Sequence, residues 1–317
     1  MTLQPFLGIL TVYILSIFSS IAYRIIIMDA GLQSTTWKYA AQKGFFSHDD
    51  DPESWDFRAT TRAYLGLLDR EYPTDAAFDP KRERTQWQRF EHYVYELNKQ
   101  DPTEKRYRML YVIRHGQGIH NVRENEVGRE EWDRYWSKLS GDGARIWEDA
   151  ALTDFGEQQA RDMFMAATSD IPHPEAIYTS PLRRCLRTTE LAFAHLLDVR
   201  TPSIKENLRE RLGIHTCDKR SSKTIISSAY PSFNIEPGFA EDDKLWKPDV
   251  RETFEEHMVR IRNLLNEIFN QNKDSLFISL TMHSGDIMAL FGATGWNKIP
   301  VAAGAVYPLF ILAERED

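Results

Sequence analysis

The chain has 317 residues, of which 42% are hydrophobic and 27% are charged, proportions that are ordinary for a globular protein. Acidic side chains outnumber basic ones by 47 to 39, and the net charge of -8 argues against a general nucleic-acid-binding protein, which needs a basic surface. Two cysteines in a chain of this length exclude a scaffold built on disulfide bonds. An anionic ligand must therefore be bound by a local cluster of cations.

The N-terminal segment is mostly apolar and has no charged side chain before Arg24. Residues 5–23 are long enough to span a bilayer, and the basic residues follow this run, which favours a membrane anchor with the rest of the chain in the cytosol. Ser20-Ile21-Ala22 also resembles a signal-peptide cleavage site, which would give a secreted protein. A helix packed on the domain would instead leave the protein cytoplasmic. We assign residues 1–28 to an anchor or signal and residues 29–107 to an N-terminal extension that packs on the core.

Along the remaining chain, short apolar runs alternate with amphipathic stretches. This alternation predicts an α/β fold, with a mostly parallel central sheet and helices on both faces. The corresponding domain covers residues 108–317. In such a sheet, polar residues that follow the strands meet at one edge. Strands are predicted at residues 109–113, 176–179, 203–208, 276–281 and 306–312, and helices at residues 84–99, 153–167, 182–197, 250–270 and 287–291.

Four polar blocks, at residues 114–121, 179–184, 208–213 and 282–285, could together bind a phosphoryl group. Its negative charge requires fixed cations, and its transfer requires a nucleophile in line with the leaving oxygen. Arginine can donate two parallel hydrogen bonds to such oxygens, and histidine can act as the nucleophile. The candidates are His115 as nucleophile, Glu210 as proton donor, and Arg114, Asn121, Arg184 and His283 as the groups that hold the phosphate.

Several neighbours of these residues are candidates for the pocket wall. His120 could line the side of the leaving group or order its loop. Lys219 and Arg220 could bind a second anionic group of the substrate, or could form a solvated basic loop. Asp286 is a rival to Glu210 as the proton donor. The candidate lining residues are Gln117, Gly118, His120, His215 and Ser284.

In their order and spacing, these blocks resemble the histidine phosphatase superfamily of phosphoglycerate mutase-like proteins. The first block is similar to a fungal and plant branch that reads Arg-His-Gly-x-Gly-x-His-Asn, and residues 152–160 are similar to its Leu-Thr-x-x-Gly-x-x-Gln-Ala segment. The resemblance implies a three-layer α/β/α sandwich and no metal or other cofactor. Another branch takes its acid from an Asp directly after the second histidine. Ser284 occupies that position here, which favours Glu210 over Asp286.

The first and third blocks also bear on the reaction class. Cofactor-dependent mutases of the family usually read Arg-His-Gly-Glu-Ser, whereas this chain has Gln117 and Gly118 after Gly116. It also lacks their Glu-x-x-Tyr-Gly pattern around the acid. We therefore expect a phosphatase that hydrolyses the phosphomonoester of a small metabolite through a phosphohistidine. The alternatives are a phosphoglycerate-type phosphomutase, and a membrane-tethered protein that binds phosphorylated ligands without turnover.

Overall fold

The computed structural model describes residues 35–52, 63–163 and 170–316. The apolar run at residues 5–23, for which we predict a membrane anchor, lies outside these ranges. Among the described helices, none is both long enough and apolar enough to cross a bilayer. Residues from Thr36 onward form one compact unit.

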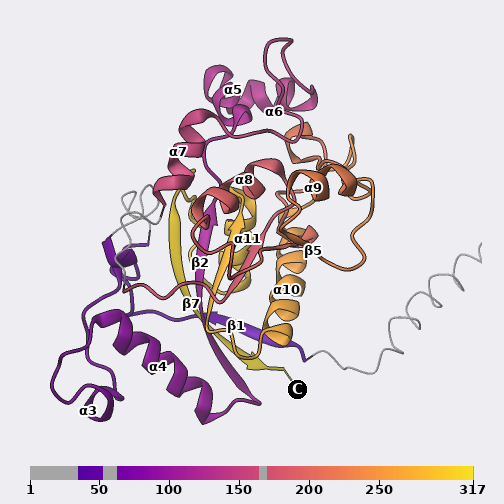
Figure 1. Cartoon of the computed structure of the whole chain (residues 1–317). Helices are drawn as coiled ribbons and strands as arrows, with labels where there is room; N and C mark the ends of the chain where they lie inside the picture. Colours follow the sequence, from indigo (N-terminus) through magenta and orange to yellow (C-terminus); the bar gives the residue numbers. More distant parts are fainter. Residues whose placement is uncertain (1–34, 53–62, 164–169, 317) are drawn as a thin grey trace, which may run out of the picture. The chain divides into compact units, whose positions relative to one another are not determined.

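One sheet of seven strands forms the centre of this unit (Figure 1). The strands are β1 (Trp37–Ala41), β2 (Lys105–Arg114), β3 (Ala176–Thr179), β4 (Ser203–Ile204), β5 (Asn234–Ile235), β6 (Phe277–Met282) and β7 (Val306–Arg315). Their order across the sheet is β1-β7-β2-β6-β3-β4-β5. The pairs from β2 through β6, β3 and β4 to β5 are parallel, and only β7 runs against its two neighbours. The predicted mostly parallel sheet is confirmed.

Helices cover both faces of the sheet and complete the three predicted layers. The helices are α3 (Asp75–Phe78), α4 (Gln86–Gln100), α5 (Ile119–Val127), α6 (Arg129–Arg134), α7 (Asp154–Asp162), α8 (Arg183–Ala192), α9 (Lys223–Ala229), α10 (Phe254–Gln271) and α11 (Ser284–Ala293). Apolar residues of α10 and α11 pack on one face of the central strands. Residues of α4 and the end of α8 pack on the other face.

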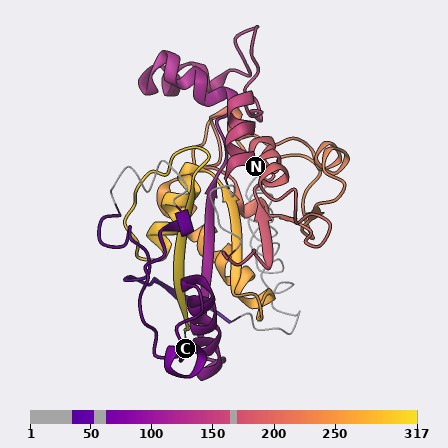
Figure 2. The same ribbon diagram turned by 60° about the vertical axis from the view of Figure 1, so that its left-hand side comes forward.

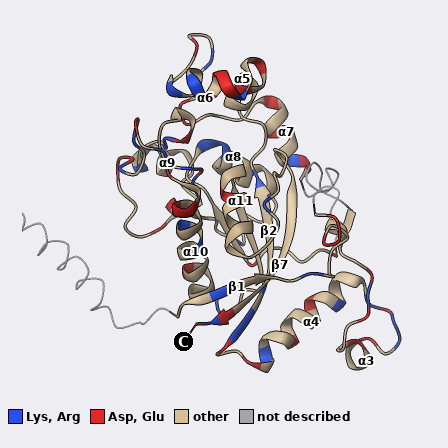
Figure 3. Ribbon diagram, turned by 180° about the vertical axis from the view of Figure 1, so that it is seen from behind, with Lys and Arg blue, Asp and Glu red and all other residues tan. Residues whose placement is uncertain are grey.

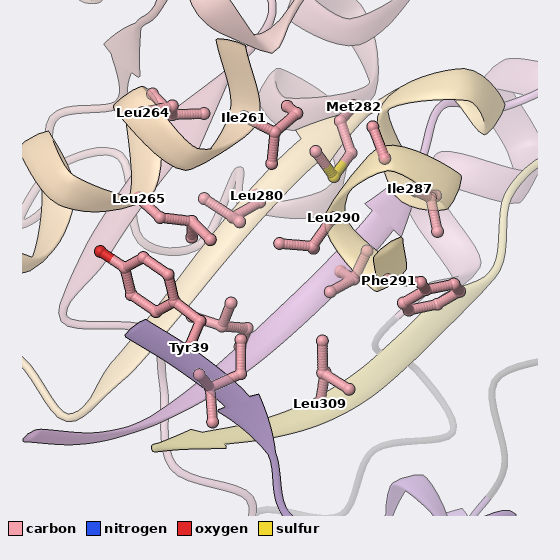
Figure 4. Close-up of a cluster of buried hydrophobic side chains, with 14 of the residues drawn as sticks. Tyr39, Ile261, Leu264, Leu265, Leu280, Met282, Ile287, Leu290, Phe291 and Leu309 are labelled. Carbon is pink, nitrogen blue, oxygen red and sulfur yellow. The ribbon is translucent and has the colours of Figure 1, made fainter. Parts of the chain in front are cut away.

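The larger apolar core lies between α10, α11 and the sheet (Figure 4). Leu264 and Leu265 of α10 and Leu290 of α11 lie in one cluster with Leu280 of β6, and all four are buried. All six residues of β6 are buried, as expected for a strand covered by helices on both faces. This packing fixes the carboxyl end of β6, after which His283 follows.

The strand β2 begins four residues earlier than predicted. Charged side chains interrupt the apolar pattern at residues 105–108, so the sequence predicts only residues 109–113. Arg108 is nevertheless buried, because its Nη2 donates hydrogen bonds to the carbonyl oxygens of Asn272 and Lys273 just after α10. A charged side chain is tolerated in a central strand when such acceptors are near.

Several elements of the structure are absent from the predicted set, among them β1, α5 and α6. The strand β1 belongs to the predicted extension and pairs antiparallel with β7, from Trp37 opposite Arg315 to Ala41 opposite Ile311. The helices α5 and α6 lie beyond the carboxyl end of β2 (Figure 2). They carry both acidic and basic side chains rather than a continuous apolar face (Figure 3), so periodicity gives little signal for them.

Candidate active site

The strand β2 ends at Arg114 and places His115 in the interior, where only 2% of the residue is exposed. Its Nδ1 lies 2.7 Å from the carbonyl oxygen of Gly116, and because a carbonyl can only accept, Nδ1 carries the proton. Its Nε2 accepts a hydrogen bond from Nε of Arg184 at 3.2 Å. Nε2 is therefore the unprotonated nitrogen of His115, the form that a nucleophilic imidazole requires.

Three histidines lie at this end of the sheet, and the surroundings keep all three neutral. Burial lowers the pKa of His115 well below its ordinary value, and the neighbouring Arg184 and Arg114 lower it further. Burial, followed by Arg184, likewise lowers the pKa of His120 and of His283. A neutral His115 keeps its lone pair even in mild acid.

Arg184, on the first turn of α8, joins the first and last blocks of the site. It is 1% exposed, and its Nε lies 3.2 Å from Nε2 of His115 and 3.2 Å from Nδ1 of His283. Because Arg184 can only donate, Nδ1 of His283 accepts and Nε2 of His283 carries the proton, 2.8 Å from Oγ of Ser180. The rings of His115 and His283 lie 5.0 Å apart. Strands β2 and β6 and helix α8 thus bring three predicted residues together.

The far end of Arg184 is held by Asp218, a residue that is not among the predicted candidates. Oδ1 of Asp218 accepts from Nη2 of Arg184 at 3.0 Å, and its Oδ2 accepts from Nη1 of Arg251 at 3.0 Å. Burial alone would raise the pKa of Asp218, but Arg251 and Arg184 outweigh it and hold the pKa below its ordinary value. Two arginines thus meet one buried aspartate, so the positive charge of Arg184 is not fully neutralised and remains suited to a phosphoryl group.

Glu210 lies at the same edge of the sheet, against the N-terminus of α11. Its Oε2 accepts from the backbone N–H of Gly285 at 2.9 Å, and the hydroxyl of Ser284 lies 3.4 Å from the same oxygen. Its Oε1 accepts from the backbone N–H of Arg211 at 2.9 Å. A Cβ atom on Gly285 would lie 1.8 Å from Oε1, so the carboxylate occupies the space that a side chain would take. The second histidine block therefore also holds the candidate acid.

Arg114 and Asn121, the other two candidates for binding phosphate, each use part of their hydrogen-bonding capacity within the protein. Nη1 of Arg114 donates to the carbonyl oxygen of Val301 at 2.6 Å, and its buried Nε has no partner among the described residues. Oδ1 of Asn121 accepts from the backbone N–H of Gly118 at 2.9 Å and so caps α5. The amide nitrogen of Asn121 is then the group that this side chain can offer to a phosphate.

The segment at residues 152–160 braces the loop that carries His115. The backbone N–H of Gln117 donates to Oε1 of Gln159 at 2.8 Å, and Oε1 of Gln117 accepts from Oγ1 of Thr153 at 3.0 Å. A Cβ atom on Gly116 would lie 2.2 Å from the carbonyl oxygen of Gly156. These two glycines allow the two backbones to approach closely.

Among the remaining lining candidates, His120 lies nearest to the nucleophile by ring distance. Its ring centre is 5.7 Å from that of His115. His215 lies farther out, with Nε2 3.4 Å from Oδ1 of Asp133 on α6 and Nδ1 3.5 Å from Nη2 of Arg251. His215 thus borders the cluster of Asp218 and Arg251 rather than His115.

The sequence leaves open Asp286 as a proton donor, and Lys219 and Arg220 as ligands of a second anion. In the structure, all three side chains bond to other groups of the protein. Asp286 is fully buried with Oδ1 2.6 Å from Nε2 of His257, so it bonds to α10. The guanidinium group of Arg220 is buried and donates to Glu206 and to backbone carbonyls. Lys219 donates to Glu148 at 2.7 Å. Of the two alternatives for Lys219 and Arg220, neither a second anion site nor a solvated loop fits Arg220, because its donors are already used and the residue is buried.

Among the described residues, one group combines three side chains of the kinds that bind metals. His215, Cys217 and Asp218 have their ligand atoms within 4.8 Å of one another. The carboxylate of Asp218 already bonds to Arg184 and Arg251. The positive charge of these two arginines opposes a metal cation at this position.

Comparison with known proteins identifies the family. The family model for the histidine phosphatase superfamily (branch 1) matches residues 110–303. The chain belongs to this superfamily. A protein of Arthroderma benhamiae named "Probable phosphoglycerate mutase" is 43% identical over 287 residues, which cover 87% of this chain and 84% of the relative. "Phosphomutase-like protein 3" of Candida albicans is 40% identical over 210 residues, which cover 66% of each chain.

Among solved structures, the phosphoglycerate mutase from Bacillus anthracis aligns with a TM-score of 0.44 and 16% sequence identity. The alignment covers 68% of this chain and 94% of the mutase.

The neutral histidines of this member of the superfamily predict how its stability depends on pH. Folding lowers the pKa of His115, His120 and His283, so below about pH 6.5 the unfolded chain binds protons that the folded chain does not. Each histidine then removes up to about 1.4 kcal/mol of unfolding free energy per pH unit as the pH falls. The buried Asp286, with its pKa raised to about 6, opposes this loss because the folded chain binds its proton more tightly.

Chemical denaturation at about pH 7.5 and about pH 5.5 measures this balance. The three site histidines outnumber Asp286, and His48, whose pKa burial lowers to about 4, adds to the loss, so we expect a lower free energy of unfolding at the lower pH. An equal or higher value there would show that the histidines are not held neutral.

Proposed function

We propose that the chain is a phosphatase that hydrolyses the phosphomonoester of a small metabolite, with His115 as nucleophile. The observation that carries the proposal is the state of His115. It is buried, its Nδ1 proton is bonded to Gly116, and its unprotonated Nε2 faces Arg184. An imidazole in this state can attack phosphorus, and the guanidinium group beside it attracts the phosphoryl oxygens.

In the proposed first step, Arg114, Arg184, His283 and Asn121 bind the phosphoryl oxygens. Nε2 of His115 attacks phosphorus, and a P–N bond forms as the P–O bond to the leaving group breaks. Glu210 starts protonated and gives its proton to the departing alkoxide. The products of this step are the free alcohol, phosphohistidine at His115 and ionised Glu210.

In the second step, water takes the place of the departed alcohol. The carboxylate of Glu210 removes a proton from this water while its oxygen attacks phosphorus, and the P–N bond breaks. Inorganic phosphate leaves, and His115 and protonated Glu210 are restored. The arginines supply the positive charge that stabilises both transition states, so the proposal needs no metal ion.

A phosphoglycerate-type phosphomutase is the second candidate, because the Arthroderma benhamiae relative is named a probable phosphoglycerate mutase. A mutase must keep a doubly phosphorylated intermediate in the site while it turns round, and it must keep water away. Hydrolysis is favoured because Gln117 and Gly118 stand where mutases have Glu-Ser. The side chain of Gln117 accepts a hydrogen bond from Thr153, which supports its loop.

Product analysis separates these activities. The full chain would be incubated, with EDTA present, with a panel of sugar and metabolite phosphates, including 3-phosphoglycerate with a trace of 2,3-bisphosphoglycerate. We expect inorganic phosphate to be released in proportion to the ester consumed, with EDTA having little effect. Isomerisation without release of phosphate would favour the mutase. Binding without any product would favour a tethered phospholigand-binding protein, for which residues 5–23 are the proposed anchor.

A further inference from the structure

Arg260 of α10 packs against the loop that carries Glu210, and all five of its N–H groups have acceptors. Its Nε and Nη2 donate to the two carboxylate oxygens of Glu252 at 2.8 and 2.7 Å. Its Nη1 donates to the carbonyl oxygens of Asn207 and Arg209, both at 2.8 Å, and its Nη2 also donates to that of Glu210 at 3.3 Å. Arg260 thus fixes the backbone on both sides of the candidate acid.

The same guanidinium group also reaches the helix that holds the carboxylate of Glu210. Nη1 of Arg260 lies 3.7 Å from Oδ1 of Asp286, on the first turn of α11. One residue earlier, the N–H of Gly285 donates to Oε2 of Glu210. Arg260 therefore contacts both ends of the arrangement that sets the position of Glu210: its backbone and the helix that binds its carboxylate.

Glu252, just before α10, bonds to the same loop. Its side chain accepts from Arg260 and from the backbone N–H of Leu212 at 3.0 Å, and its carbonyl oxygen accepts from Nε of Arg211 at 3.0 Å. Both side chains of the Arg260–Glu252 pair are at least nine-tenths buried. A buried pair with every donor used is rigid, and it cannot be reproduced by lysine, which lacks the planar fork.

We propose that Arg260 is a positioning residue for the proton donor Glu210. The inference rests on the proposed function, because it has meaning only if Glu210 protonates the leaving group. A displacement of about 1 Å at a reacting group can reduce a rate by about a hundredfold. Loss of Arg260 leaves three carbonyl groups of the loop and the carboxylate of Glu252 without this donor. The loop can then shift, and the carboxylate of Glu210 moves with it.

The dependence of the rate on the leaving group separates this role from a merely structural one. An alkoxide must be protonated as it departs, whereas p-nitrophenolate is stable without a proton. The quantity to compare is kcat/KM, because it reports the step in which the leaving group departs. For Arg260→Met, we expect kcat/KM to fall by about a hundredfold on alkyl phosphates but by less than about tenfold on p-nitrophenyl phosphate.

A matched control is Arg108→Met. Arg108 is also a buried arginine that donates to three backbone carbonyls, those of Tyr107, Asn272 and Lys273, but it lies far along β2 from His115. Its loss should lower stability and leave the ratio of the two kcat/KM values as in the wild type. Arg260→Lys keeps the charge and much of the side-chain stem, so it provides a folded variant if Arg260→Met does not fold.

The Glu210→Gln variant is measured beside them. An equal loss on both substrates for the Arg260 variants, together with a selective loss for Glu210→Gln, would overturn the positioning role alone. If Glu210→Gln itself loses both activities equally, the assignment of Glu210 as the acid fails instead. A selective loss in the Glu210 and Arg260 variants, with an unchanged ratio for Arg108→Met, is the result that the structure predicts.

Discussion

Replacement of His115 by asparagine should lower kcat/KM by at least about a thousandfold for every phosphomonoester that the wild type hydrolyses. Asparagine is polar and of similar length, but the lone pair of its amide nitrogen is delocalised into the carbonyl group and cannot attack phosphorus. The loss should be the same for good and poor leaving groups, because both need the nucleophile. Release of inorganic phosphate, measured with each substrate at low concentration, gives the comparison.

His195→Asn is the matched control for this experiment. His195 is exposed after α8 and makes a ring contact only with His173 among the contacts described, so its replacement should leave kcat/KM near the wild-type value. The melting temperature of His115→Asn should show that it folds. A folded His115→Asn variant that retained most of its turnover would rule out a covalent intermediate at this residue.

Replacement of Glu210 by glutamine should produce a loss that depends on the leaving group. On alkyl phosphates we expect kcat/KM to fall by about a hundred- to ten-thousandfold, the usual contribution of a general acid. On p-nitrophenyl phosphate the fall should be less than about tenfold, because this leaving group departs without a proton. Glutamine keeps the shape of the side chain, so the hydrogen bond from Gly285 to its oxygen can remain.

Gly285→Ala provides an independent check on the same residue. Its added methyl group would meet the carboxylate of Glu210, the flexible end of a side chain, so the clash can be relieved by moving the acid. The variant should therefore fold and reproduce the leaving-group dependence of Glu210→Gln. A uniform loss on both substrates in these two variants would mean that another group protonates the alcohol.

The apolar pattern allows much of the fold to be predicted. β3 occupies the predicted residues 176–179, and β6 lies within one residue of its prediction, because buried strands consist of short continuous apolar runs. The strand β1 at the edge of the sheet is harder to predict. β1 lies in a segment with no partner nearby in sequence, and its place is decided by pairing with β7 about 270 residues later.

In the candidate site, too, the residues next to predicted strands could be predicted and those set by distant contacts could not. His115, Arg184 and His283 could be predicted to meet because each follows or adjoins a strand of one parallel sheet, and the structure brings them within hydrogen-bond distance. Asp218 and Arg260 could not be predicted in this way. Asp218 bonds to Arg184 and Arg251, and Arg260 bonds to the loop at residues 207–210, in each case more than thirty residues away. No local pattern distinguishes such a buried charge from a solvated one.

The most direct test of the phosphohistidine mechanism is the stereochemical course at phosphorus, followed with a phosphorothioate monoester that is chiral through two oxygen isotopes and is hydrolysed in water that carries the third. Each in-line displacement inverts the configuration of phosphorus. Attack by His115 followed by attack of water makes two displacements, so we expect net retention in the inorganic thiophosphate released. Net inversion would show that water attacks the substrate directly and would contradict the phosphohistidine intermediate.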